Sequence, residues 1–359
     1  MSGFDETAQR TETSPSIPAA VAAARSGRDI AVIIVSYKTA KLAVECLCSV
    51  EAERSAEGPL HIRAIVVDNA SGDLPTIAEA IERNHWSSWV TVVATPENGG
   101  FAYGNNVGFK CACTEAIPDY VLLLNPDTQV RPGAVGALVD FLEARPAIGI
   151  AGSSFENLDG SDWPISFRFP SLLSELEGGL QFSLATRLLR RWVVARPMSR
   201  INQPVDWICG ASMMIRAAVF ASVGGFDENY FLYFEETDFC RRAKQAGFAT
   251  WYVPTSRVMH IMGQSTTVTD VKNAFKRLPT YWFESRRRYF AMSFGIGRAA
   301  AIDIVAILAY SLGALKRRIL RRAHAEVPYF IRDLIRNSIL WPRNRNIAAV
   351  RFNAVGARQ

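Results

Sequence analysis

Short apolar runs alternate with amphipathic stretches from residue 29 to about residue 152. This alternation is typical of a parallel β-sheet covered by helices. The pattern predicts strands at residues 30–36, 62–68, 90–94, 120–124 and 148–152, and helices near 41–52, 75–82, 101–116 and 132–143. Asp73 is a candidate N-cap, and Pro75 and Pro132 suit a first helical turn, where a missing N–H is not needed.

The pattern changes after residue 152. Asp159-Gly160 is typical of a hairpin turn, and we expect further strands at 207–216 and 249–253. Residues 170–203 are basic and irregular, which fits a mobile lid, an acceptor-binding insertion or, equally, a variable surface excursion. Between the last two strands, the aromatic run Tyr230-Phe231-Leu232-Tyr233-Phe234 ends in Glu235, Glu236, Thr237 and Asp238, and then Arg241 and Arg242. Acids clustered beside aromatic residues are candidates for a catalytic base.

Polar or glycine-rich groups follow four of the predicted strands: Ser36-Tyr37, Asp68-Asn69, Asn98-Gly99-Gly100 and Asn125-Pro126-Asp127. Ligands of open α/β sheets collect at the carboxyl ends of the strands, so these groups predict a nucleotide crevice. The first strand is not followed by Gly-x-Gly-x-x-Gly, and the sequence has no Walker lysine motif. The usual dinucleotide and P-loop sites are therefore disfavoured.

Each of these groups has a chemical interpretation and a structural alternative. Asp127 is a candidate ligand of Mg²⁺ or Mn²⁺, or else a turn residue before a helix. Asp68 would accept hydrogen bonds from a base or ribose, with the same alternative. His260 would contact the metal or a phosphate, or would be structural. The glycine-rich run of residues 98–106 offers backbone N–H groups to an anion at a helix start, and Asn105 lies in this run.

The chain has a formal net charge of +6, which fits nucleic acid, a membrane surface or a phosphate-rich substrate. The basic residues of 286–322 bracket an apolar stretch at 299–315, which contains Asp303 and is short for a membrane span. We expect an interfacial amphipathic helix or, equally, a helix packed on the catalytic domain, and we do not expect nucleic acid as a partner. The six cysteines lack a Cys-x-x-Cys motif and fit structural roles in a reduced, cytosolic protein.

Taken together, the ordered motifs resemble glycosyltransferase family 2, in particular its rhamnosyltransferase-like bacterial members. The matching segments are Val35-Ser36-Tyr37, Val67-Asp68-Asn69-Ala70-Ser71, the run from Asn98 to Asn106, Leu124-Asn125-Pro126-Asp127, Gly210-Ala211, Gly224-Gly225-Phe226-Asp227-Glu228 and the aromatic-acid run through Arg241. The resemblance implies a GT-A fold, which is a Rossmann-like α/β domain with a mainly parallel sheet flanked by helices and a smaller antiparallel acceptor-side part. The resemblance covers residues 29–292, the expected GT-A domain, which divides at 152/153 into nucleotide and acceptor halves. Residues 1–28 lack an apolar period and are expected to be a disordered leader, and residues 293–359 to be a basic and apolar helical tail.

The resemblance also implies roles for single residues. Ser36, Tyr37, Asp68, Asn98, Gly99, Gly100, Asn105 and Asn125 would bind the nucleotide sugar, with Asp68 on the base. Asp127 and His260 would hold a divalent metal, Mg²⁺ or Mn²⁺, where an Asp-x-Asp motif usually stands. Glu235-Glu236 occupies the place of a Glu-Asp pair, which makes Glu236 the expected base. Asp238 is the alternative base, although it is also placed to pair with Arg241 or Arg242 one helical turn on.

The implied reaction is inverting transfer of a sugar, L-rhamnose by resemblance, from a dTDP-, UDP- or GDP-sugar to a hydroxyl of a lipid-linked or glycan acceptor. The basic and apolar C-terminal region places this reaction at the inner face of the cytoplasmic membrane. Two other classes stay open at this point. One is a non-catalytic nucleotide or polyanion binder that depends on Arg286, Arg287 and Arg288, and the other is a nucleotidyltransferase, which would release pyrophosphate.

Overall fold

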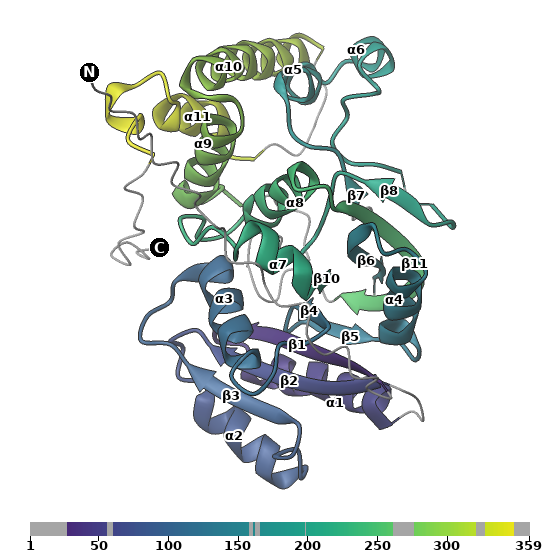
Figure 1. Cartoon of the computed structure of the whole chain (residues 1–359). Helices are drawn as coiled ribbons and strands as arrows, with labels where there is room; N and C mark the ends of the chain where they lie inside the picture. Colours follow the sequence, from purple (N-terminus) through teal and green to yellow (C-terminus); the bar gives the residue numbers. More distant parts are fainter. Residues whose placement is uncertain are drawn as a thin grey trace, which may run out of the picture.

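In a computed structural model of the protein, the structure describes residues 27–55, 60–157, 161, 166–197, 199–260, 276–320 and 327–347. Within these ranges the central element is a nine-stranded sheet in the order β3-β2-β1-β4-β10-β6-β11-β5, with β8 paired to β11 (Figure 1). Its strands are β1 (Arg28–Ser36), β2 (Leu60–Asp68), β3 (Val90–Ala94), β4 (Tyr120–Leu124), β5 (Thr128–Val130), β6 (Ile148–Glu156), β8 (Gln203–Val205), β10 (Ser212–Arg216) and β11 (Ala249–His260). The mixed, mainly parallel sheet confirms the predicted fold class.

The strand directions bring the predicted site residues to one edge of the sheet. β1 is parallel to β2 and β4, and β2 is parallel to β3. β10 runs antiparallel to both β4 and β6, and β11 is parallel to β6, so β4, β6 and β11 share one direction. The carboxyl ends of these strands therefore meet at the same edge, where β10 begins.

The first half of the chain forms the predicted elements. The helices α1 (Ala40–Ser55), α2 (Leu74–Arg83), α3 (Gly100–Ala112) and α4 (Ala134–Glu143) flank strands whose central side chains are buried (Figure 1). Two helix starts differ from the prediction. Asp73 stands at the N-cap position of α2 but makes no capping bond, because its carboxylate accepts from Ser36 and Thr39 instead. Pro132 lies before α4, whose first N–H groups are capped by Glu53 of α1.

The second half corrects the sequence interpretation at three places. Residues 170–203 are not irregular throughout. They contain α5 (Leu172–Leu180), which starts in a Ser171/Ser174 capping box, and α6 (Ser183–Leu188). The strand expected at 207–216 is divided into β9 (Trp207–Ile208), which pairs with β7 (Ser166–Phe167), and β10. The strand expected at 249–253 runs on to His260. The helices α7 (Ala217–Val223) and α8 (Glu235–Gln245) complete this half.

Some sequence predictions fall outside the described residues. These are residues 1–26 of the expected leader, the Asp159-Gly160 turn, and residues 321–326 and 348–359 of the expected tail.

A helical layer at the end of the molecule opposite α2 contains α9 (Thr280–Phe294), α10 (Ile296–Ile319), α11 (Phe330–Asn337) and a 3₁₀ turn (Pro342–Asn344), with α5 packed on α10 (Figure 1). Three consecutive arginines of α9 are buried in this layer. Arg286 pairs with Asp303 of α10 (2.6 Å) and Glu175 of α5 (2.8 Å). Arg287 donates to the carbonyl of Asn337, and Arg288 binds Asp227.

These contacts follow from helix geometry, because successive side chains on a helix point about 100° apart and so reach three different neighbours. The three charges are turned inward and bonded. They are therefore not available to a polyanion, contrary to what the polyanion-binding alternative requires.

The Arg286–Asp303 pair gives a stability prediction. Asp303 also accepts hydrogen bonds from the Ser338 hydroxyl (2.7 Å) and the Ile339 N–H (2.8 Å), so Asp303→Ala leaves a buried guanidinium and two donors without this partner. We expect chemical denaturation to show a loss of about 3 kcal/mol in the free energy of unfolding. The matched control is Glu79→Ala, which breaks an exposed pair with Arg83 and should change stability by less than ~0.5 kcal/mol. Equal effects of the two substitutions would contradict the assignment.

Candidate active site

The carboxyl edge of the sheet brings together residues from the ends of β1, β2 and β4. Ser36 ends β1 beside Asp68 at the end of β2, and Asn125, Pro126 and Asp127 follow β4. Ser36 is fully buried, and its hydroxyl donates to Asp73 (2.7 Å). Tyr37 next to it is 41% exposed. Ser36 thus anchors the loop, whereas the side chain of Tyr37 is the one that a ligand can reach.

Asp68 is built into the turn that follows β2. One carboxylate oxygen accepts from the N–H (2.9 Å) and the hydroxyl (2.7 Å) of Ser71, and the other accepts from the N–H of Leu74 (3.0 Å). Burial alone would raise its pKa, but these hydrogen bonds outweigh it and hold the pKa below the usual value. Asp68 is therefore ionised and fixed in orientation at the edge.

Asn69 was not among the predicted site residues, yet it connects two loops of the site. Its amide donates to the side-chain oxygen of Asn98 (3.0 Å) and to the carbonyl of Gly100 (3.1 Å), and its oxygen accepts from the N–H of Gly99 (3.3 Å). A buried Asn directly after a strand-end Asp was the available signal. Through Asn69, the glycine-rich loop is held against the end of β2.

The same loop touches the aromatic run. The N–H of Phe101 donates to the carbonyl of Phe231 (2.9 Å). Gly100 has a φ of +85°, and a Cβ added there would lie 1.9 Å from that same carbonyl oxygen. Only glycine meets both conditions at this position.

The two asparagines of α3 act inside the protein. Asn105 is buried and donates to the carbonyl of Phe101 in its own helix (2.9 Å). Asn106 exchanges hydrogen bonds with the backbone of Phe226, accepting from its N–H and donating to its carbonyl, both at 2.9 Å. Neither amide group is thereby placed on a ligand, and Asn106 positions the Gly225-Phe226 loop.

Asp127 and His260 meet across the sheet edge. Nε2 of His260, the last residue of β11, lies 3.3 Å from Oδ1 of Asp127, and both residues are buried. A carboxylate and an imidazole are donors that a divalent cation accepts, and protein sites for Mg²⁺ often add phosphate oxygens to one or two carboxylates. Within the described ranges, no group of three or more His, Cys, Asp or Glu side chains gathers in a way suited to a metal ion. The pair thus fits part of a metal site shared with a diphosphate.

Glu236 lies near this pair. A backbone hydrogen bond from Gly210 reaches its carboxylate, and the carbonyl of the next residue, Ala211, accepts from the N–H of Asn125 (3.1 Å). Partly buried Cys209 is close enough to Glu236 and Asp127 for both charges to raise its pKa, after the larger effect of burial. The segment 209–211 therefore contacts both the expected base, Glu236, and the loop that carries the expected metal ligand, Asp127.

Glu235 and Glu236 start α8, and each has an Oε2 atom that is shielded from solvent and lacks a hydrogen-bond partner within the described part of the chain. Burial raises the pKa of Glu236 to about 7, although backbone hydrogen bonds oppose the shift. Burial and the charge of Glu236 raise the pKa of Glu235 well above its ordinary value. Glu235 is fully buried and Glu236 half-buried, so Glu236 is the one that a substrate can approach.

Asp238 is held by a different partner. Its carboxylate accepts from Nε of Arg242 at 2.7 Å, one helical turn on, and Arg242 also donates to the carbonyls of Val223 and Gly225. Burial raises the pKa of Asp238 despite this arginine. Through Arg242, Asp238 joins α8 to the turn at Gly224-Gly225. This pairing leaves the Asp238 carboxylate poorly placed for proton transfer.

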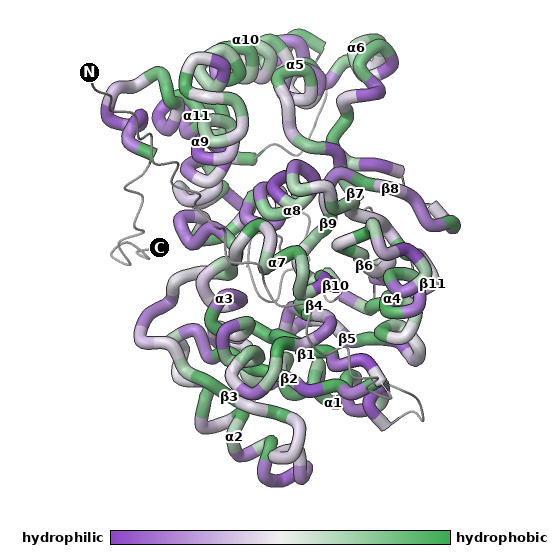
Figure 2. The backbone as a smooth tube through the Cα atoms, in the orientation of Figure 1, coloured by the Kyte–Doolittle hydropathy of each residue, from purple (hydrophilic) through white to green (hydrophobic). Residues whose placement is uncertain are grey.

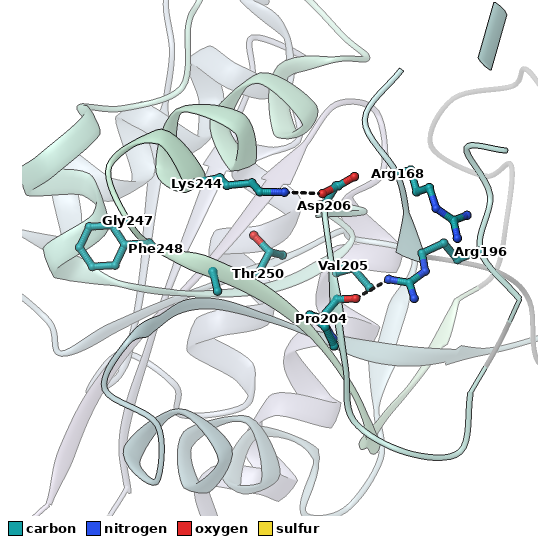
Figure 3. Close-up of a pocket in the computed structure, with 10 residues that line it drawn as sticks. Arg168, Arg196, Pro204, Val205, Asp206, Lys244, Gly247, Phe248 and Thr250 are labelled. Atoms are coloured by element: carbon teal, nitrogen blue, oxygen red, sulfur yellow. Dashed lines mark hydrogen bonds and ion pairs between the residues drawn. The ribbon is translucent and has the colours of Figure 1, made fainter. Parts of the chain in front are cut away.

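A separate cavity of about 460 Å³ lies at the β8 side of the sheet (Figure 3). Arg168, Arg196 and Lys244 line it, and Lys244 pairs with Asp206 at 2.7 Å. None of the site residues predicted from the sequence lines this cavity. It is therefore distinct from the carboxyl edge described above.

Solved structures show what kind of fold this is. The mannosyltransferase PcManGT from Pyrobaculum calidifontis, solved with GDP-Man and Mn²⁺, matches 89% of this chain and 82% of its own with a TM-score of 0.50 at 14% identity. GalNAc-T7, solved with UDP, GalNAc and Mn²⁺, matches 86% of this chain and 57% of its own with a TM-score of 0.53 at 13% identity. The fold is that of the GT-A glycosyltransferases.

Sequence comparison is more specific. The N-acetylglucosaminyl-diphospho-decaprenol L-rhamnosyltransferase of Mycobacterium tuberculosis is 32% identical over 225 residues, which cover 59% of this chain and 70% of that protein. The rhamnosyltransferase WbbL of Escherichia coli is 26% identical over 195 residues, which cover 54% of this chain and 70% of that protein. The sequence pattern described as "Glycosyltransferase like family 2" matches residues 27–279. The chain belongs to this family and is a glycosyltransferase that uses a nucleotide sugar, as its motifs predicted.

The close contact at Gly100 can be tested by stability. Gly72 and Gly100 both have positive φ, +82° and +85°, but only Gly100 has an atom within 4 Å of an added Cβ. Gly72→Ala should lower the free energy of unfolding by about 1–2 kcal/mol, the cost of a left-handed residue with a side chain. Gly100→Ala should lose a further ~1–3 kcal/mol because the Phe231 loop must move. If denaturation curves of the two variants coincide, the contact between the loops is not as described.

Proposed function

We propose that this protein transfers L-rhamnose from a nucleotide sugar to a hydroxyl of a sugar joined through diphosphate to a polyprenol, with inversion at the anomeric carbon. The observation that carries the substrate assignment is the 32% identity to the L-rhamnosyltransferase of Mycobacterium tuberculosis, which extends over 70% of that protein. The similarity to WbbL agrees with the same sugar. The proposed transfer reaction is also supported by two residues at the carboxyl edge of the sheet, the ionised Asp68 and the half-buried Glu236.

Glu236 is the base in this proposal. Its carboxylate takes the proton of the acceptor hydroxyl while that oxygen forms a bond to the anomeric carbon of the donor. The bond between the anomeric carbon and the diphosphate breaks on the opposite face, and the electron pair leaves with the nucleoside diphosphate. A base with a pKa of about 7 suits this task, because about half of it is ionised at neutral pH and its carboxylate still accepts a proton readily.

The remaining residues of the edge bind and orient the donor. Asp68 faces the nucleoside, and Tyr37 offers an exposed ring. The N–H groups of Gly99 and Gly100 already donate to the side chains of Asn69 and Asn98, so this loop shapes the site and does not hold an anion through those groups. The N–H of Asn125 holds its loop to Ala211. Asp127 and His260 would hold the divalent cation, Mg²⁺ or Mn²⁺, which when bound offsets negative charge on the diphosphate. Asp238 and Asn105 keep the positioning roles that their contacts suggest.

We place the reaction at the cytoplasmic face of the membrane, where a polyprenyl-diphosphate acceptor is anchored and nucleotide sugars are dissolved. The basic C-terminal region supports this location, since cations near the surface favour contact with anionic lipid. Among the described helices, α10 is long and apolar enough to be considered for a membrane span, although a third of its most apolar stretch is buried in the protein.

Substitution of the two candidate bases separates their roles. Glu236→Gln should lower kcat by about 10²- to 10⁴-fold and leave the affinity for the donor unchanged, because only proton transfer is lost. The control, Asp238→Asn, weakens the bond to Arg242 and should act mainly on stability. In the native enzyme, kcat/KM should rise with pH through a midpoint of about 7 and level off above it, because Glu236 must be deprotonated. If the Glu236→Gln enzyme has a normal kcat and the same pH profile as the native enzyme, Glu236 is not the catalytic base.

The donor and the metal can be tested together by thermal shift. A ligand that binds only the folded protein stabilises it by about 2.7 kcal/mol at a hundredfold excess over Kd. We expect dTDP-L-rhamnose with Mn²⁺ or Mg²⁺ to raise the melting temperature more than UDP- or GDP-sugars, and Asp127→Ala to remove the metal-dependent part of the shift. A control with Glu156→Gln, on a neighbouring strand end, should keep it. A shift that is the same without metal would contradict the role of Asp127, and release of pyrophosphate would indicate a nucleotidyltransferase.

A further inference from the structure

The long helix α10 carries its large apolar side chains on the outside. Ile304, Leu308, Leu312, Leu315 and Ile319 follow one another at helical spacing, and each is between 47% and 69% exposed. A helix on the surface of a soluble protein usually shows the reverse pattern, with the apolar stripe toward the core. We call these five residues the outer stripe of α10.

The inner side of α10 is made of small residues. Ala306, Ala309 and Gly313 are buried, and a Cβ added at Gly313 would lie 2.2 Å from the carbonyl oxygen of Gly179 in α5. The two helices therefore approach closely through their backbones, and α10 packs on α5 at this point without large side chains. The single acid of the helix, Asp303, also points inward, to Arg286. The outer stripe thus combines large apolar groups with no acidic neighbour on its own helix.

The stripe continues onto α6. At the end of α10, the Lys316 ammonium lies 4.8 Å from the ring centre of Phe182 and donates to the carbonyl of Gln181. Beyond Phe182, α6 and the residues after it expose Leu184, Leu188 and Trp192. Figure 2 shows α10 and α6 at the same end of the molecule, with hydrophobic positions along both. An exposed apolar surface that extends over two elements marks an interaction site.

Basic residues border this surface. Arg298 lies near the start of α10 and Arg318 at its end, and Arg187, Arg190 and Arg191 are exposed on and after α6. Apolar groups ringed by arginine and lysine are the combination that inserts into the boundary of an anionic bilayer. A second copy of the chain would bring the same positive charges together at its contact, which disfavours self-association.

We propose that the outer stripe of α10, with α6, is the surface through which this protein lies on a bilayer of anionic phospholipid. The helix lies in the plane of the interface and does not cross the membrane, because its inner side is held by α5, α9 and α11. The proposal deepens the proposed function, on which it rests for its biological meaning, by naming the surface that faces the acceptor's membrane. The binding itself is measurable without any transferase activity.

The position of this surface suits a lipid-linked acceptor. α9 contacts α10 through Arg286 and Asp303, and at the same time the Ser285 hydroxyl donates to the carbonyl of Leu232, in the aromatic run that precedes Glu236 (3.1 Å). One layer of helix therefore separates the lipid-facing surface from the acceptor side of the site. An acceptor whose lipid stays in the bilayer has a short path to the base.

Flotation of the full chain with vesicles tests the proposal. Vesicles of phosphatidylcholine with phosphatidylglycerol should bind the protein, pure phosphatidylcholine should bind it more weakly, and added salt should reduce the difference. The double variant Leu308→Glu/Leu312→Glu should lower the apparent vesicle affinity at least ~tenfold, because two anchoring side chains become charged. The matched control is Ile117→Glu, since Ile117 is 70% exposed but lies in the loop before β4, far from α10.

Two further readings keep the test decisive. With a water-soluble, short-chain acceptor, the Leu308→Glu/Leu312→Glu variant should release nucleoside diphosphate as fast as the native protein, which would show that the variant is folded. If the native protein itself shows no such release, the result counts against the proposed function and not against this surface. Arg190→Glu/Arg191→Glu is a second double variant, outside α10, that should weaken binding to anionic vesicles and leave binding to pure phosphatidylcholine unchanged. Unchanged flotation of both double variants would overturn the proposal. Sedimentation would assign the surface to a second copy if the native protein is a dimer that does not bind vesicles and the Leu308→Glu/Leu312→Glu variant is a monomer.

Discussion

The hydrogen bond from the N–H of Phe101 to the carbonyl of Phe231 joins the two halves of the site, and it exists only because Gly100 has no side chain. On one side of this contact stands the loop that continues from β3 into α3, held by Asn69. On the other stands the aromatic run that leads to Glu236. A second contact, between Asn106 and Phe226, lies deeper along α3, and a third, between Asn125 and Ala211, lies at the sheet edge. The site is thus assembled by backbone groups from distant parts of the chain.

The sequence predicted β1 to β4 to within two residues at each end, since buried parallel strands are continuous apolar runs that end in polar groups. It missed the short strand β5 and placed the end of β6 four residues early. It also placed Asp68, Asp127 and His260 at one edge, because parallel strands share their carboxyl ends. It failed at α5 and α6, whose helical pattern makes sense only against α10, more than a hundred residues later. Gly178 and Gly179 lie within α5, where their missing side chains allow α5 and α10 to pack closely.

The sequence could propose which residue types stand at the edge, but not which of their atoms are already bonded within the protein. Ser36, Asp68 and Asn105 are equally polar in sequence. In the structure the hydroxyl of Ser36 and the amide of Asn105 are engaged internally, and Asp68 shapes a turn. The distinction between Glu236 and Asp238 has the same origin, because Arg242 reaches only the second of them. Such differences depend on neighbours that are remote in sequence.

Tyr233 and Phe234 have φ values of +72° and +69°, and two consecutive left-handed residues with side chains are uncommon. They turn the chain so that α8 begins abruptly at Glu235 instead of continuing the preceding loop. Glu236 therefore sits at the positive end of a helix dipole, which favours its ionised form, while its enclosure favours the neutral form. The bent backbone thus has an electrostatic consequence: it keeps a shielded carboxylate within reach of both charge states near neutral pH.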